Sequence, residues 1–163
     1  SLIAFLSAAK SGRETLIAPV YSHLYYDVIP DKVQEIKCPD ILIVEGINVL
    51  QGPKNSRKQK KRVFVSDFFD YSIYVDARHN DLRQWFLERF LTLKKTAFQN
   101  PESYFHRYAE MNKEQSLDFA NNIWNTINLP NLDQNILPTR FRADLILEKG
   151  ACHFVRGVRI RKI

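Results

Sequence analysis

The chain has 163 residues, of which 45% are hydrophobic and 26% charged, and this composition suits one globular domain with its own core. No stretch approaches the roughly 18 uninterrupted apolar residues of a membrane span, and the N-terminus lacks a secretory signal pattern, so we expect a cytoplasmic protein without membrane contact. Cys38 and Cys152 form no CxxC motif or Cys/His cluster, and we therefore expect reduced thiols and no metal site in the protein itself.

The net charge of +6 comes from one short segment. Six basic residues without an acid between them fall within residues 54–62, which we interpret as an exposed basic loop between two strands. Without these six of the 24 basic residues, the remaining 18 match the 18 acidic ones. We do not expect nucleic-acid binding, although a basic loop keeps it open as an alternative.

The first predicted element is a helix, because residues 2–6 place apolar side chains at helical spacing and Gly12 supplies a stop. Residues 15–30 mix β-branched and aromatic residues with two prolines, which favours extended segments and turns.

Three short apolar runs predict strands of a buried sheet. The strongest covers residues 41–44 and ends at Glu45-Gly46; the others cover residues 72–76 and 144–147. A continuous apolar run suits a parallel strand buried on both faces. Because helical stretches separate the runs, we expect an α/β fold with crossover helices.

Two helices are predicted between the second and third runs. One is amphipathic and spans residues 82–93, and the other runs from about Lys113 to Ile127. Residues 153–160 alternate apolar and polar side chains, which predicts a terminal strand exposed on one face.

Glu45 lies where open parallel sheets place their ligands, outside the carboxyl end of a strand. In P-loop kinases such an acid acts on the magnesium ion or its water shell. A Glu-Gly turn that merely ends the strand is an equally weighted interpretation. The Gly-x-x-x-x-Gly-Lys-Ser/Thr loop that would decide between them does not occur in these 163 residues.

Read together and in chain order, several blocks resemble bacterial type I pantothenate kinase. Residues 89–90 (RF) and 103–106 (SYFH) belong to the set, and the Tyr-Ser-His segment distinguishes it from the related uridine kinases and phosphoribulokinases. The other blocks are residues 18–27 (APVYSHLYYD), 39–50 (PDILIVEGINVL), 63–68 (VFVSDF) and 135–140 (NILPTR). The chain is thus similar to the C-terminal half of that family, with residues 1–163 forming the substrate-binding and lid side of a single kinase domain.

The resemblance implies transfer of the ATP γ-phosphoryl group to the 4′-hydroxyl of pantothenate, the first step of coenzyme A synthesis. It also implies Mg²⁺ with the ATP, feedback inhibition by coenzyme A and a homodimeric full-length protein. The implied fold is a P-loop NTPase-type three-layer parallel sheet with flanking helices, here without its N-terminal P-loop strand. We expect this chain alone to be inactive, and a non-catalytic pantothenate- or coenzyme A-binding module remains the alternative.

The missing strand has a structural consequence. In this fold the P-loop strand lies between the strand that ends at Glu45 and the strand that ends at Asp76. We therefore expect two unpaired strand edges and an open core.

Arg89 and Glu45 are the candidate catalytic residues. Arg89 lies on the amphipathic helix, where its charge could stabilise the transferring phosphoryl group or form a surface ion pair with Glu88 or another acid. Lys149 and His153 match family positions on the nucleotide-base side, where the planar imidazole could stack on adenine.

The resemblance implies that an aromatic group lines the substrate pocket. The spacing of these aromatic residues, taken alone, is more typical of core packing. Asn128 would hydrogen-bond the substrate or, alternatively, cap a helix C-terminus. Arg140 and Arg142 are either lid residues facing phosphates or ordinary surface arginines. The substrate-binding residues implied by the resemblance are Tyr21, His23, Tyr26, Phe86, Phe90, Phe98, Phe105, Tyr108, Ile127 and Asn128.

Two positions depart from the family pattern. Phe86 stands where the bacterial enzymes place a tyrosine, and Leu93 where they often have phenylalanine. We expect these changes to alter sensitivity to pantothenamides or coenzyme A without changing the reaction.

Overall fold

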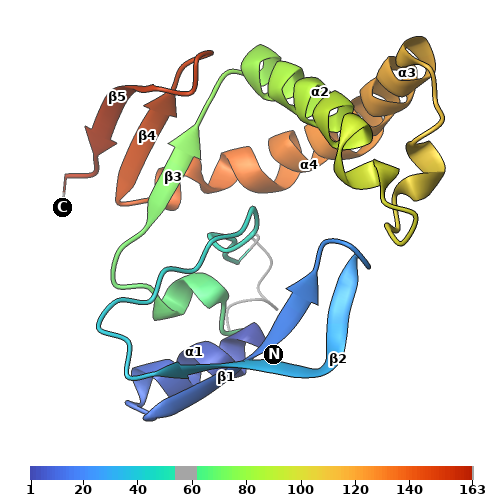
Figure 1. Cartoon of the computed structure of the whole chain (residues 1–163). Coiled ribbons are helices and arrows are strands. Elements are labelled where there is room, and N and C mark those ends of the chain that lie inside the picture. Colours follow the sequence, from blue (N-terminus) through green and yellow to red (C-terminus); the bar gives the residue numbers. More distant parts are fainter. Residues whose placement is uncertain (54–61, 163) are drawn as a thin grey trace.

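A computed structural model describes residues 1–53 and 62–162 and shows an α/β chain (Figure 1). Strands β1 (Thr15–Ser22) and β2 (Asp27–Lys37) form an antiparallel hairpin. Apart from Arg62, the predicted basic loop at 54–62 lies outside the described residues.

A second sheet has the strand order β3-β4-β5, formed by β3 (Ile73–Asp76), β4 (Leu145–Lys149) and β5 (Val155–Ile160). Strands β3 and β4 are parallel, whereas β5 runs antiparallel to β4. The two later apolar runs are therefore confirmed as adjacent parallel strands.

The first helix is confirmed as α1 (Leu2–Lys10). The Ser1 side chain accepts a hydrogen bond from the Ala4 amide, and Gly12 follows the helix with a φ of 72°, a left-handed conformation that glycine adopts without steric cost. The hairpin after it confirms the extended segments predicted for residues 15–30, and β2 continues to Lys37.

The strand predicted at residues 41–44 is wrong, since this segment has no regular secondary structure and pairs with no described strand. Ile41 and Ile43 are 81% and 86% exposed, while Leu42 and Val44 between them are partly buried. This period of two is that of an extended chain with one apolar face uncovered. The segment has the local character of a strand but no partner edge to bond.

The helices lie between β3 and β4. Helix α2 (His79–Lys95) confirms the predicted amphipathic helix, and α3 (Lys113–Ile123) confirms the second. Asn112 caps α3 reciprocally with Gln115, each side chain accepting from the other's amide at 2.9 Å.

The helical path does not end near Ile127 as predicted. It continues through a π-helical segment (Trp124–Asn128), the short α4 (Leu129–Asn131) and a second π-helical segment (Leu132–Ile136). No described helix is both long enough and apolar enough to cross a membrane.

The main hydrophobic core joins α2 to α3 and to the loop between them. Its buried centre is Phe90, Phe98 and Ala120. Partly buried residues packed against it are Phe86, Leu87, Phe105, Tyr108 and Phe119.

The terminal strand is more exposed than predicted. In β5 all residues are exposed except Gly157, which is partly buried, so both faces of the strand rather than one meet solvent. The reason is its position at the sheet edge, where no described helix packs over it (Figure 1).

Candidate functional site

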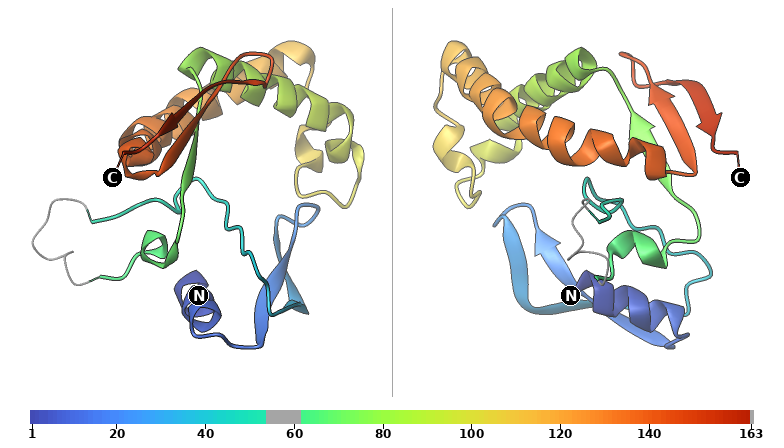
Figure 2. Two further views of the ribbon diagram at one scale, coloured as in Figure 1. Left: turned by 90° about the vertical axis from the view of Figure 1, so that its left-hand side faces the viewer. Right: turned by 180° about the vertical axis from the view of Figure 1, so that it is seen from behind.

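The tip of the β1-β2 hairpin contacts the loop between α2 and α3 (Figure 2). The Tyr104 amide donates a hydrogen bond to the Leu24 carbonyl at 2.9 Å. The Tyr26 ring stacks on Tyr104 with centroids 5.2 Å apart and meets the edge of Phe105 at 4.9 Å. Tyr26 has a φ of 57°, which a non-glycine residue adopts at a cost, so the turn places this ring against the loop with some backbone strain.

The aromatic contacts continue from the hairpin into the core. Phe105 stacks on Phe98 at 5.2 Å, Phe98 meets Phe90 at 5.7 Å, and Tyr108 contacts Phe119 at 4.7 Å. Phe98 and Phe90 are 6% and 9% exposed, as core packing requires. Phe105 and Tyr108 remain partly exposed, so the group has a buried base and an accessible rim.

Tyr21 and His23 extend this rim along the hairpin. Their rings meet edge to face at 5.2 Å, and Tyr21 also lies 6.3 Å from Tyr26. Loss of water contact, with smaller contributions from Tyr26 and Asp27, raises the pKa of the Tyr21 hydroxyl. This hydroxyl therefore remains a hydrogen-bond donor at neutral pH.

Asn128 lies within the helical path and does not cap a helix end. It belongs to the π-helical segment, its backbone has right-handed helical angles, and its side chain has no hydrogen bond to a described residue. Single-turn π-helical segments are frequent at functional sites, because they redirect side chains out of the α-helical pattern. The neighbouring Ile127 is exposed, and Trp124 of the same segment packs against Phe86 at 6.0 Å.

Arg89 is exposed on α2 and forms no ion pair with Glu88 or another acid among the described residues. The Glu88 carboxylate instead accepts a hydrogen bond from the Gln84 side chain. The alternative of a surface ion pair is therefore not found, and this guanidinium is available to an anionic ligand.

Lys149 and His153 are brought together with a residue that the sequence did not single out, Trp85 of α2. The His153 ring stacks on the Trp85 indole with centroids 4.4 Å apart and planes 26° apart. The Lys149 ammonium lies 4.8 Å from the centroid of the same indole. The spacing of Trp85, one helical turn before Arg89, was the available signal.

Arg140 and Arg142 are both held by other parts of the chain. The Arg140 guanidinium donates to the Asp76 carboxylate at the end of β3 (2.8 Å), and Glu148 on β4 bonds to both Arg140 and Arg159. Arg142 donates to the Leu50 carbonyl at 2.9 Å and to the Ser66 hydroxyl at 3.1 Å. In this structure both arginines join secondary-structure elements.

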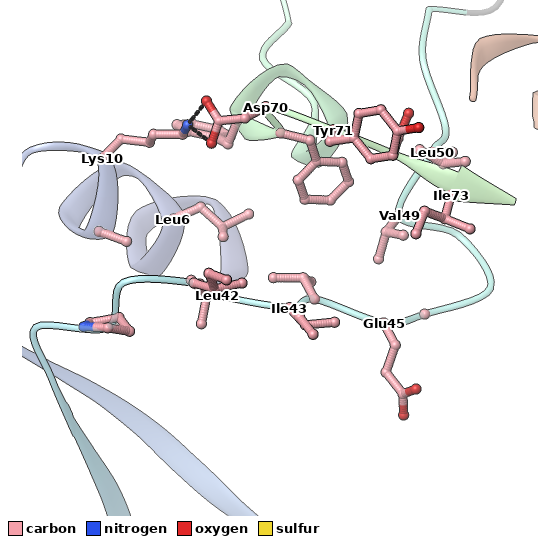
Figure 3. A pocket seen from close by; sticks show the side chains of 18 of the residues that line it. Leu6, Lys10, Leu42, Ile43, Glu45, Val49, Leu50, Asp70, Tyr71 and Ile73 are labelled. Atoms are coloured by element: carbon pink, nitrogen blue, oxygen red, sulfur yellow. Dashed lines mark hydrogen bonds and ion pairs between the residues drawn. The ribbon is translucent and has the colours of Figure 1, made fainter. Parts of the chain in front are cut away.

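Glu45 lies on the unpaired segment beside an apolar cavity of about 1230 Å³ (Figure 3). The cavity lies between α1, the segment of residues 38–50 and the free edge of β3. Leu42, Val49 and Ile73 line it, whereas the Glu45 carboxylate points away from these side chains and is exposed. The expected position at the end of a buried strand is therefore not formed by the described residues.

The described residues contain no group of three His, Cys, Asp or Glu side chains arranged to hold a metal ion. Glu45 offers an exposed carboxylate beside this cavity. A single carboxylate suits Mg²⁺, which keeps several waters and takes its other ligands from nucleotide phosphates.

Comparison with known proteins gives consistent relatives. No family model matches the chain. Curated proteins named pantothenate kinase from Myxococcus xanthus, Mannheimia succiniciproducens and Shouchella clausii are 53%, 55% and 54% identical to it, over 99–100% of its residues. The chain spans about half the length of these relatives, covering 50–51% of each.

Proposed function

We propose that this chain, which is 53–55% identical to curated pantothenate kinases along essentially its whole length, forms the C-terminal, substrate-binding half of such an enzyme. The complete protein would transfer the γ-phosphoryl group of ATP to the 4′-hydroxyl of pantothenate, the first step of coenzyme A synthesis. The observation that carries this proposal is the identity of 53–55% over essentially every residue of the chain.

The pantothenate site is the aromatic rim between the hairpin tip and the loop after α2. Pantothenate combines a branched apolar centre with hydroxyl, amide and carboxylate groups, and pockets for such ligands pair apolar walls with a few polar groups. Tyr21 and His23 offer polar atoms, and Phe105 and Tyr108 offer apolar surface. We assign the remaining contacts to Tyr26, Phe86, Phe90, Phe98, Ile127 and Asn128.

The phosphoryl group is assigned to Arg89 and the nucleotide base to Lys149 and His153. The Arg89 guanidinium is permanently charged and forms no ion pair with a described residue, which suits stabilisation of negative charge on the transferring group. Glu45 would hold the water shell of Mg²⁺, and the ion, when bound with ATP, neutralises phosphate charge.

We assign the phosphate-binding loop and the general base to the half of the protein that this chain does not contain. The cavity supports a P-loop NTPase fold for the whole, because it separates the extended residues 41–44 from the free edge of β3. A strand inserted there would pair with both and cover Ile43 and Ile73. Inhibition by coenzyme A, a homodimeric assembly and a cytoplasmic location complete the proposal.

The test is ATP-dependent phosphorylation of pantothenate by the full-length protein and its Arg89→Ala variant. Loss of an arginine that stabilises the transferring group should lower kcat by about 10³-fold. Lys95→Ala, a charge removed from the exposed end of the same helix, should leave kcat within about 2-fold because the Lys95 side chain forms no ion pair with a described residue. An inactive wild-type protein that still binds pantothenate would favour a non-catalytic binding module instead.

A further inference from the structure

Trp85 makes three contacts with the end of β4 and the turn that connects β4 to β5. Its indole N–H donates a hydrogen bond to the Ala151 carbonyl at 3.0 Å. Its ring stacks on His153, and the Lys149 ammonium lies over the same ring. One side chain of α2 therefore fixes a backbone group, a ring and a cation of a turn that lies more than 60 residues away in sequence.

The turn needs such support because its backbone is strained. His153 has a φ of 67°, in the left-handed region that costs a residue with a Cβ roughly 1–2 kcal/mol. Within the turn, the His153 amide donates to the Gly150 carbonyl and the Gly150 amide donates to the Phe154 carbonyl, both at 2.9 Å. A strained conformation persists where its surroundings hold it, and here the Trp85 contacts add to the two bonds of the turn itself.

The result is a flat ring presented to solvent at a fixed angle. Trp85 covers one face of the His153 imidazole, and His153 as a residue is exposed, so we take its other face as the surface that meets a ligand. Planar nucleotide bases stack on such surfaces, and this stacking does not depend on which base is bound.

The His153 ring and the Arg89 guanidinium are arranged in the order in which a nucleotide carries its base and its phosphates. Arg89 follows Trp85 by one helical turn, so the two lie on the same face of the helix at neighbouring levels. A ligand with a planar base at one end and phosphates at the other would therefore place its base on His153 and extend along α2 toward the arginine.

We propose that Trp85 is a positioning residue for a purine base, acting through His153 by locking the β4-β5 turn and the angle of the imidazole ring. This inference rests on the proposed function, because the ligand it addresses is the ATP of the kinase reaction. Trp85 does not touch the base itself. It determines whether the ring that does so is already oriented before binding, which lowers the entropic cost of ordering that ring when the base binds.

The experiment measures the ATP dissociation constant of the full-length protein by titration calorimetry, without pantothenate. Trp85→Leu removes both the ring and the N–H donor, and we expect about 10-fold weaker ATP binding, the scale of one lost base stack. Trp85→Phe keeps a ring against His153 but loses the bond to Ala151, and its loss should be smaller, about 3-fold.

A double-mutant cycle separates positioning from general packing. His153→Asn removes the ring while keeping a residue type that tolerates positive φ, and it should also weaken ATP binding by about 10-fold. If Trp85 acts through His153, adding Trp85→Leu or Trp85→Phe to this variant should change the constant by less than about 2-fold. Additive losses would overturn the proposal, as would equal affinities in all variants.

Trp124→Phe provides the matched control, since this buried indole packs against Phe86 and has no contact with the turn. Its ATP affinity should stay within about 2-fold of wild type, and the pantothenate KM should be unchanged in both Trp85 variants. Because ATP binding is measured alone, a protein that binds ATP but phosphorylates another acceptor would overturn the proposed function and leave this inference testable. Conversely, phosphorylation of pantothenate together with an unchanged ATP dissociation constant in the Trp85 variants would support the proposed function and overturn this inference.

Discussion

The helical region around α2 and α3 and the region around α1 and residues 38–50 differ in how completely they enclose their apolar side chains. The first buries Phe90 and Phe98 among aromatic partners from neighbouring segments. The second leaves Ile41 and Ile43 exposed around a large cavity (Figure 3). Helical contacts can be completed within one stretch of chain, whereas an extended segment must find its hydrogen bonds on another strand.

The sharpest way to test this contrast is a charge placed on the open region. In the full-length protein, Ile43→Asp should lower the free energy of unfolding by about 3–5 kcal/mol, because the proposed neighbouring strand would bury an unpaired carboxylate. Val158→Asp on the exposed strand β5 is the control and should cost about 1 kcal/mol or less. Denaturant unfolding of both variants gives the comparison, and equal small losses would show that Ile43 is exposed in the whole protein too.

A second variant tests whether the helical region depends on the hairpin for function. Tyr26→Asn removes the ring stacked on Tyr104 while keeping a residue type that tolerates the left-handed backbone. Losing one aromatic pair of about 1 kcal/mol should raise the pantothenate KM about 5-fold through a looser rim, and leave the ATP KM unchanged. A rise in both constants, measured by steady-state kinetics, would indicate a general loss of structure.

The smallest expected effect concerns neither region but the start of the second sheet, where β3 begins beside β4. The Asp144 carboxylate accepts hydrogen bonds from the Ser72 hydroxyl at 2.6 Å and the Ser72 amide at 2.8 Å, and these bonds lower the pKa of Asp144. A lowered pKa in the folded state contributes stability above the ordinary aspartate pKa, about 3.9, that is lost as the pH falls through the folded value.

Asp144→Asn should therefore be slightly less stable than wild type at pH 7, because a neutral amide accepts these bonds more weakly than a carboxylate. The difference should shrink as the pH falls below about 4, where wild type loses the same charge. Thermal unfolding across this pH range makes the measurement. A difference that is independent of pH would assign the effect to packing instead of charge.

Sequence patterns predicted the elements whose physical cause is local. The α1 stop at Gly12, the amphipathic periodicity of α2 and the apolar runs that became β3 and β4 each depend on residues within a few positions of one another. The resemblance of ordered blocks to pantothenate kinase also needed only the sequence, and relatives over the full chain confirm it.

Only the tertiary structure decided features that depend on distant partners. Residues 41–44 have the composition of a strand but remain unpaired, since ladder hydrogen bonds need an edge that the described residues do not supply. The stacking of Trp85 on His153, the capture of Arg140 by Asp76 and the freedom of Arg89 likewise follow from which segments meet in space. The sequence by itself determined which segments favour helix or strand and which family the chain resembles. The three-dimensional contacts determined which side chains remain available to a ligand.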